Sequence, residues 1–345
     1  KKTLRVLEKT DIAILIVESG TEPGEFEQDL VNKIKDRGIP LLICATKIDL
    51  APDFEPTRKW ATEHSSVFIP VSSSTREGIE RLKEALGELS PMGLSEPQII
   101  GDLITGGDIV VLVVPIDKAA PKGRLILPQV MTIRDALDHD AIAITVKERE
   151  LRACLESLGR KPRLVITDSQ AFLKVDADTP RDIQMTSFSI LMARYRGDLA
   201  AFVAGAAAVD RLKIGDRVLI SEGCTHHQQA DDIGRVQIPR WLRQLVGGEL
   251  EFGFSSGRDF PPDFDKYDLI VHCGGCMINS REVRYRQRVA SEAGVPMTNY
   301  GVLLAKVHGI LDRALEPFPL ARLALSERSE KRPGRPKLRV SRTTL

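Results

Sequence analysis

Short, continuous runs of apolar residues alternate with amphipathic segments along most of this chain. Runs of this kind are typical of strands buried on both faces of a parallel sheet. They occur at residues 11–17, 40–44, 109–114, 141–146, 164–167, 216–224 and 267–273. Apolar residues three or four apart predict helices at residues 79–89, 128–138, 148–158, 187–211, 238–246, 280–293 and 303–316. Alternating strands and helices indicate an α/β protein with mainly parallel sheets.

A segment rich in proline and glycine at residues 90–97 divides the chain. The regions on both sides of this linker are long enough to bury cores of their own. We expect three successive α/β units, one before the linker and two after it. Their predicted bounds are residues 1–90, 98–215 and 216–325. From residue 326 to 345 the chain is basic and poor in apolar residues, so we expect a disordered tail.

The composition limits the class of protein. Of the 345 residues, 42% are hydrophobic and 28% are charged, which is ordinary for a globular protein. The net charge of +1 argues against a nucleic-acid partner. We find no apolar run of about 18 residues and no signal peptide, so neither a membrane nor secretion is expected. Five scattered cysteines do not form a disulfide framework, which favours a reducing cytoplasm.

The run at residues 40–44 ends in a motif that resembles the guanine-reading Asn/Thr-Lys-x-Asp element of GTPases. Thr46, Lys47 and Asp49 occupy its fixed positions. In that element the aspartate accepts two hydrogen bonds from guanine, and the lysine stem lies across the nucleotide plane. A four-residue match is also compatible with an ordinary turn after a strand. The spacing to a second loop, which resembles the Ser-Ala-Lys loop of GTPases, favours the guanine site. That loop contains Ser72, Ser73 and Ser74.

The phosphate-binding half of a GTPase domain is missing from this sequence. No Gly-x-x-x-x-Gly-Lys-Ser/Thr loop occurs in it, and the elements that hold Mg²⁺ and the γ-phosphate are absent before residue 11. Phosphoryl transfer depends on these parts for positioning and for neutralising charge. We therefore expect residues 1–90 to be the second half of a small GTPase domain, which should not hydrolyse GTP by itself.

Three cysteines and two histidines form the strongest chemical signal in the chain. Cys224 and Cys273 each follow an apolar run, and Cys276 completes a Cys-Gly-Gly-Cys motif. His226 and His272 stand beside them in sequence. Strands of one parallel sheet end at a shared edge, where ligand sites usually form. Soft thiolates with imidazole nearby select iron–sulfur clusters or zinc over hard cations. These residues therefore predict a metal site.

The identity of the metal and its fourth ligand are both open at this point. A cubane cluster needs a ligand on each iron, and the two other cysteines, Cys44 and Cys154, belong to other domains. The fourth ligand would then be His226, His272, a carboxylate or water. The alternative is a structural zinc bound by three cysteines and a histidine. In that case, or with a redox cluster, the protein would be a GTPase with a supporting metal.

Several separated motifs resemble HydF, the family of iron-only hydrogenase maturation GTPases. They lie at residues 120–129, 186–190, 224–227, 232–235, 238–242, 272–277 and 298–301. The resemblance implies a GTPase domain, a dimerisation domain and a cluster-binding domain. It implies a [4Fe-4S] cluster at the Cys-x-His and His-Cys-x-x-Cys motifs, with GTP and Mg²⁺ bound by the intact protein.

The resemblance also implies a function. Such a protein is a scaffold that receives a transient diiron precursor from radical-SAM maturases and passes it to apo FeFe-hydrogenase. A homodimer through the middle domain, or a higher homo-oligomer, is implied in the same way. No nucleophile–base pair appears in the sequence, which favours the scaffold over an enzyme that acts on a substrate of its own.

Overall fold

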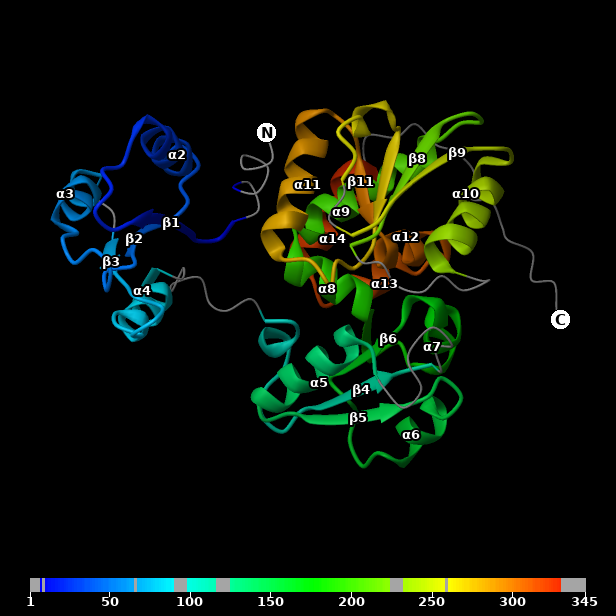
Figure 1. The fold of residues 1–345 in the computed structure, drawn as a ribbon. Coiled ribbons are helices and arrows are strands. Elements are labelled where there is room, and N and C mark those ends of the chain that lie inside the picture. Colours follow the sequence, from blue (N-terminus) through cyan, green and yellow to red (C-terminus); the bar gives the residue numbers. More distant parts are fainter. Residues whose placement is uncertain are drawn as a thin grey trace. The chain divides into compact units, whose positions relative to one another are not determined.

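The computed structural model describes residues 7, 10–64, 67–89, 98–115, 125–223, 232–257 and 260–329 (Figure 1). The chain forms two compact units, Lys1–Pro97 and Gln98–Leu345. Cys224, His226 and the last residues of the expected tail lie outside the described residues. The first part of that tail belongs to a helix, α14 (Pro319–Ser329).

The first unit is a three-stranded parallel sheet with the order β1-β2-β3. Its elements are β1 (Ala13–Glu18), α2 (Glu25–Lys35), β2 (Leu41–Thr46), α3 (Glu55–Glu63), β3 (Val67–Pro70) and α4 (Ile79–Leu89). β2 is buried on both faces, as its continuous apolar run predicts. In β1 only alternate residues are buried, and Ile14 and Ile16 are 41% and 66% exposed. The described helices therefore leave one face of β1 uncovered.

The second unit contains two four-stranded parallel sheets (Figure 1). The first has the order β5-β4-β6-β7. Its elements are β4 (Ile109–Val113), α5 (Leu127–Asp138), β5 (Ile142–Val146), α6 (Leu151–Ser157), β6 (Leu164–Thr167), α7 (Phe172–Asp178), β7 (Gln184–Ser187) and α8 (Phe188–Arg196). β4 and β6 are buried throughout, because helices cover both faces of the sheet.

The second sheet has the order β11-β10-β8-β9. Its elements are α9 (Leu199–Ala206), β8 (Arg217–Ser221), α10 (Ile238–Val246), β9 (Glu251–Ser255), β10 (Leu269–His272), α11 (Ser280–Glu292), β11 (Met297–Asn299), α12 (Tyr300–Val307) and α13 (Leu311–Ala314). Figure 1 shows α10 and α11 on opposite sides of this sheet.

Both sheets of the second unit repeat one topology. In each, the chain adds its second strand on one side of the first strand, and then its third and fourth strands on the other side. The direction of winding reverses between the first and third strands, which are β8 and β10 in the second sheet. Ligands of open α/β sheets bind where this reversal opens a crevice at the carboxyl ends of the strands.

One predicted helix, at residues 187–211, is divided in the structure into α8, α9 and a short 3₁₀ helix (Ala207–Arg211). α8 ends at Arg196, Gly197 is extended, and α9 begins after Asp198, whose carboxylate accepts a hydrogen bond from the amide of Ala201. α9 then packs against β11 and α14. The chain thus passes from one sheet to the other near Gly197, earlier than the expected boundary at residue 215.

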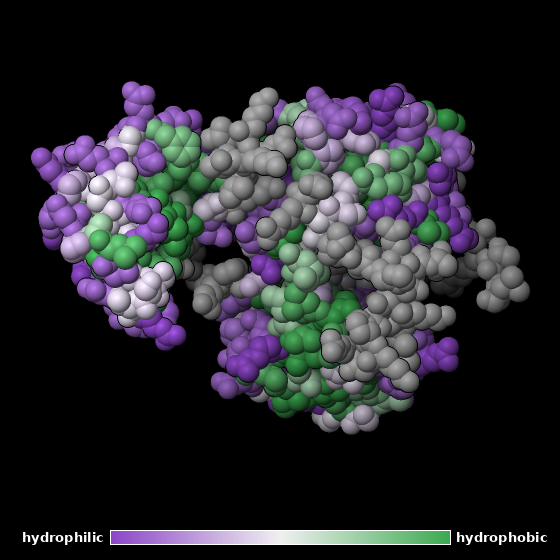
Figure 2. Space-filling view, viewed as in Figure 1, coloured by the Kyte–Doolittle hydropathy of each residue, from purple (hydrophilic) through white to green (hydrophobic). Residues whose placement is uncertain are grey.

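The edge strand β5 exposes an apolar surface. Ile142 is 47% exposed and Leu137, at the end of α5, is 54% exposed. Figure 2 shows hydrophobic residues gathered over the region of β4 and β5. Among the described residues, no strand pairs with the outer edge of β5. An unpaired apolar edge of this kind is a template for pairing with another chain.

Candidate metal centre

The His-Cys-x-x-Cys motif lies at the winding reversal of the second sheet. β8 and β10 are parallel neighbours, with Ser221 opposite His272. Cys273 follows β10 directly and Gly223 is the second residue after β8, so both lie at the carboxyl edge of the sheet. Cys224 is the next residue after Gly223 but lies outside the described part of the chain. The structure thus places Cys273 and the residue before Cys224 at one edge of the sheet.

The sulfur of Cys273 accepts two backbone hydrogen bonds. The amide nitrogen of Gly223 lies 3.0 Å from this sulfur, and that of Gly275 lies 3.3 Å from it. Gly275 has a φ of +65°, a left-handed conformation that strains other residues. Two N–H groups aimed at one sulfur favour its thiolate, which is the form that binds a metal.

The backbone of Cys273 is fixed as firmly as its sulfur. Its amide donates to the carbonyl of Ser221 at 3.0 Å. Its carbonyl accepts from Nδ1 of His272 at 2.7 Å and from Nδ2 of Asn299 at 3.2 Å. The Asn299 side chain also caps α12 through its Oδ1, which accepts from the amide of Gly301 at 2.8 Å. Cys273 is therefore held before any metal binds.

The His272 ring is fully buried, and both of its nitrogens have partners. Nδ1 lies against the Cys273 carbonyl, and Nε2 lies 3.2 Å from Nη1 of Arg286. Burial and the positive charge of Arg286 lower the pKa of His272 to about 3, so the ring is neutral. Neither ring nitrogen is left for a metal in this arrangement. The expectation that His272 is a ligand is therefore not supported by its surroundings.

Cys276 lies half-buried at the end of the Cys-Gly-Gly-Cys turn. Burial raises the pKa of its thiol, while its own amide, the charge of Arg196 and the amide of Met277 act in the opposite direction. Arg196 is in the last turn of α8. A buried thiolate needs a positive partner, and a metal ion or cluster would be such a partner.

A buried acidic group beside Cys273 was not predicted from the sequence. Glu222 is 3% exposed, and its Oε1 accepts from the hydroxyl of Tyr300 at 3.4 Å. Burial, then the charges of Glu222 and Cys273, raise the pKa of Tyr300 well above its usual value, so Tyr300 stays neutral. Gly234 leaves room for this pair, because a Cβ there would lie 2.2 Å from the Tyr300 hydroxyl. The only sequence signal was a glutamate between a buried strand and Gly-Cys.

The donors at this edge fit a thiophilic metal or cluster. They are the two described cysteines, Cys273 and Cys276, and the Cys273 sulfur accepts from the amides of Gly223 and Gly275. No group of three potential metal ligands occurs among the described residues, a set that excludes Cys224 and His226. The donor chemistry of these residues therefore fits a metal site at this edge.

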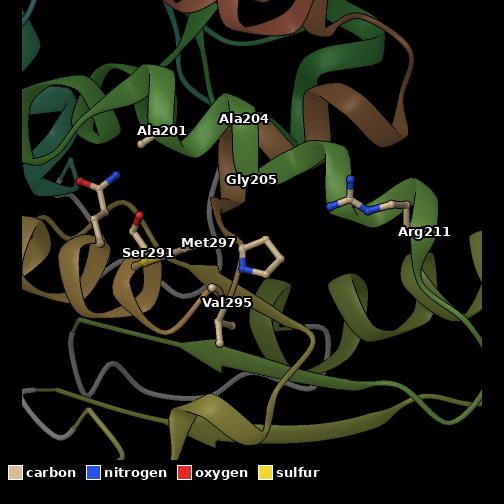
Figure 3. A pocket seen from close by; sticks show the side chains of 10 residues that line it. Ala201, Ala204, Gly205, Arg211, Ser291, Val295 and Met297 are labelled. Carbon is tan, nitrogen blue, oxygen red and sulfur yellow. The ribbon is translucent and has the colours of Figure 1, made fainter. Parts of the chain in front are cut away.

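A separate cavity of about 410 Å³ lies between α9 and the start of β11 (Figure 3). Its walls include Ala201, Gly205, Ser291 and Met297, with Arg211 at one end. Met297 is the first residue of β11, so the cavity lies at the amino-terminal edge of the sheet. It is therefore distinct from the cysteine edge.

The guanine-motif residues lie at the carboxyl ends of β2 and β3. Thr46 ends β2, and its hydroxyl donates to the carbonyl of Val17 at 3.3 Å. Lys47 has a φ of 58° and its Nζ lies 3.0 Å from Oε1 of Glu18. Asp49 is exposed. The guanine-reading role of these residues stays a prediction.

The serine loop follows the neighbouring strand. β3 pairs with β2, and the amide of Val71 donates to the carbonyl of Ala45 at 2.8 Å. Ser72 is buried, and its Oγ accepts from the amide of Thr75 at 3.1 Å, while Ser73 and Ser74 are exposed. The structure thus brings both loops of the predicted guanine site to one edge.

Two family models match consecutive parts of the second unit. The Hydrogen maturase F dimerization domain matches residues 99–197, and the Hydrogen maturase F tetramerization domain matches residues 200–317. Together they cover more than half of the chain. They meet where the structure passes from one sheet to the other, between α8 and α9. The residues that match the dimerization domain include β5, the strand with the unpaired apolar edge.

Curated relatives resemble the chain more distantly. Translation initiation factor IF-2 of Lachnoclostridium phytofermentans is 29% identical over 171 residues, which cover 46% of this chain and 14% of that protein. GTPase Era of Geobacter metallireducens is 23% identical over 94 residues, covering 26% of this chain and 32% of that protein. The chain thus spans less than a third of either relative's length.

None of the helices in the described part of the chain is both long and apolar enough to cross a membrane.

Proposed function

Because the chain belongs to the hydrogen maturase F family, we propose that it is the scaffold on which a cofactor of FeFe-hydrogenase matures. In this proposal the cysteine edge of the second sheet holds a [4Fe-4S] cluster. The chain then carries a diiron precursor, as cargo, to apo FeFe-hydrogenase. The matched domain descriptions support a homo-oligomer, and radical-SAM maturases are the proposed source of the cargo.

One observation carries the cluster proposal. The amide of Gly223, the residue before Cys224, lies 3.0 Å from the sulfur of Cys273. Cys224 follows Gly223 in the chain, and its thiolate is proposed to join that of Cys273 at this edge. Cys276 follows Cys273 through a turn. This supports three thiolates, those of Cys224, Cys273 and Cys276, around one metal group.

The surroundings of His272 favour a cluster over a closed zinc site. A structural zinc with three cysteines needs a fourth protein ligand, usually a histidine. Both nitrogens of His272 already have partners, which leaves His226 as the histidine for that role. A cubane with three cysteines does not need a permanent fourth protein ligand. When bound, the cluster would supply an iron with an exchangeable position that can bridge to the cargo.

The fourth position is proposed to be filled by a weak, exchangeable ligand, either His226 or the buried carboxylate of Glu222. Glu222 is the described candidate, since its charge and that of Cys273 both act on Tyr300. Replacing Glu222 by glutamine removes the anionic oxygen at nearly constant volume. If Glu222 is the ligand, the E222Q protein should retain its iron but show altered g-values in the electron paramagnetic resonance (EPR) spectrum of the reduced cluster.

The matched control is His226→Ala, which removes the other candidate. A spectrum altered in H226A and unchanged in E222Q would assign the fourth position to His226 and exclude Glu222. Loss of iron from E222Q would show that its carboxylate is needed for holding the cluster itself, which contradicts an exchangeable role.

The first unit is proposed to read guanine in the intact protein. Thr46, Lys47 and Asp49 would contact the base, with Ser72, Ser73 and Ser74 on the neighbouring loop. The likeness to GTPase Era over 94 residues supports this role. The sequence contains no phosphate loop, so GTP hydrolysis with Mg²⁺ would require a phosphate-binding segment that residues 1–345 do not contain.

The scaffold proposal is tested by transfer. Protein loaded with cluster and diiron cargo should convert apo FeFe-hydrogenase to the active enzyme, whereas protein loaded with the cluster alone should not. Hydrogen evolution is measured after mixing under anaerobic conditions. Equal activation by both preparations, or by neither, would contradict the carrier role. A GTPase with a supporting metal, the second candidate, would give no activation.

A further inference from the structure

Arg286 is the largest fully buried side chain in the described part of the molecule. It projects from α11 and lies under the cysteine edge. Its Nε donates to Oε1 of Glu282 at 2.7 Å, and its Nη2 donates to the carbonyl of Gly257 at 2.9 Å. Its guanidinium also lies over the ring of Phe260, with 5.3 Å between them. A charge held away from water is tolerated only where its partners are well placed.

The remaining guanidinium nitrogen, Nη1, reaches the ends of both central strands. It lies 3.2 Å from Oγ of Ser221, the last residue of β8, and 3.2 Å from Nε2 of His272, the last residue of β10. One side chain therefore joins α11 to the two strands that lead to Cys224 and Cys273.

The chemistry of these groups determines where the proton of His272 is. An arginine side chain only donates hydrogen bonds, so Nε2 of His272 must be the acceptor. The other ring nitrogen, Nδ1, faces the Cys273 carbonyl, which only accepts, so Nδ1 carries the ring proton. The opposite tautomer would place a lone pair against that carbonyl and a proton against the guanidinium.

We propose that Arg286 is a positioning residue for the metal centre: it holds His272 in the Nδ1–H tautomer, and His272 in turn fixes the Cys273 carbonyl and the direction of its thiolate. This inference gives the histidine of the His-Cys-x-x-Cys motif a role other than ligation. It rests on the proposed function, because it assigns a purpose to the geometry of Cys273. Partners that orient metal ligands in this way usually change metal affinity about 10–100-fold when removed.

The tautomer is tested on metal-free protein, so this arm does not depend on the cluster. Nitrogen-15 NMR of histidine-labelled protein near neutral pH should show His272 protonated on Nδ1, with Nε2 unprotonated. A His272 ring protonated on Nε2, or on both nitrogens, would overturn the proposal whatever metal the protein binds.

The coupling to the metal is tested with Arg286→Met, which keeps a long side chain but removes every donor. The reconstituted variant should lose iron to a chelator at least about tenfold faster than the unmodified protein. The reduced cluster should also show changed g-values. Unchanged g-values together with unchanged iron loss would overturn the proposal.

Arg313→Met is the matched control. Arg313 is 5% exposed and donates to the carbonyls of Thr179 and Pro180, each at 2.8 Å, and these partners lie away from the cysteine edge. The Arg313→Met substitution should destabilise the fold, as Arg286→Met does, and leave the EPR spectrum of the cluster unchanged. An equal change in both variants would show that Arg286 acts only through general stability, and would overturn the positioning role. If neither variant folds, the NMR result on unmodified protein decides.

Discussion

Replacing Cys273 by alanine should abolish cluster binding and leave the fold of the second unit intact. The Cys273 sulfur accepts from the backbone amides of Gly223 and Gly275, and the fold does not rest on these two bonds. A cubane needs three or four firm ligands, so losing this thiolate should reduce iron from about four per chain to a small fraction of that amount. Iron is measured by colorimetry after anaerobic reconstitution, and the fold by circular dichroism.

Cys154→Ala is the control for this experiment. Cys154 is a free, partly buried cysteine of α6, a helix that connects β5 and β6 of the other sheet. Its loss should therefore leave the iron content unchanged. Iron retained in full by Cys273→Ala would show that the metal, if any, is held elsewhere. Iron lost from both variants would point to non-specific binding by thiols.

Acid should destabilise the region around β10, and His272 should account for much of the effect. Its pKa is about 3 in the folded protein and close to 6.5 in the unfolded chain. Between these values the unfolded state binds a proton that the folded state does not, so stability rises with pH there. As pH falls below about 6, the free energy of local unfolding should decrease by about 1.4 kcal/mol per pH unit.

Amide hydrogen exchange in β10 (Leu269–His272), followed from neutral pH down to about pH 4, measures this effect. His272→Asn is the matched variant, since its amide can still donate to the Cys273 carbonyl but has no proton to gain in this range. In this variant the free energy of local unfolding should change less steeply with pH than in the unmodified protein, and the difference should correspond to about one bound proton. Equal slopes would show that His272 is not buried in its neutral form.

Much of the fold followed from the apolar pattern. The runs at residues 216–224 and 267–273 became the neighbouring strands β8 and β10, which confirms the mainly parallel α/β class. β7 was missed because its four residues, Gln-Met-Thr-Ser, are too short and polar to give an apolar run. The helix expected at 303–316 is divided into α12 and α13, because Gly309 takes a left-handed φ of 72°.

The environment of the candidate site was less accessible from sequence. Thiolate spacing predicted Cys273 and Cys276 as metal ligands, because soft donors at strand ends have few other uses. Glu222 and Arg286 gave no signal, since charged residues are usually exposed and their burial depends on contacts far apart in the chain. Ser221 and Arg286, for example, are 65 positions apart. The burial of His272 was equally hidden, and so were the contacts of its ring with the Cys273 carbonyl and Arg286.

The central claim is that three thiolates at one sheet edge hold an iron–sulfur cluster. Anaerobic analysis of metal and acid-labile sulfide in purified protein, with EPR spectroscopy of the reduced sample, tests it most directly. The account predicts iron and sulfide in equal amounts, about four of each per chain, and a signal from a reduced [4Fe-4S] cluster. Stoichiometric zinc without sulfide would contradict it.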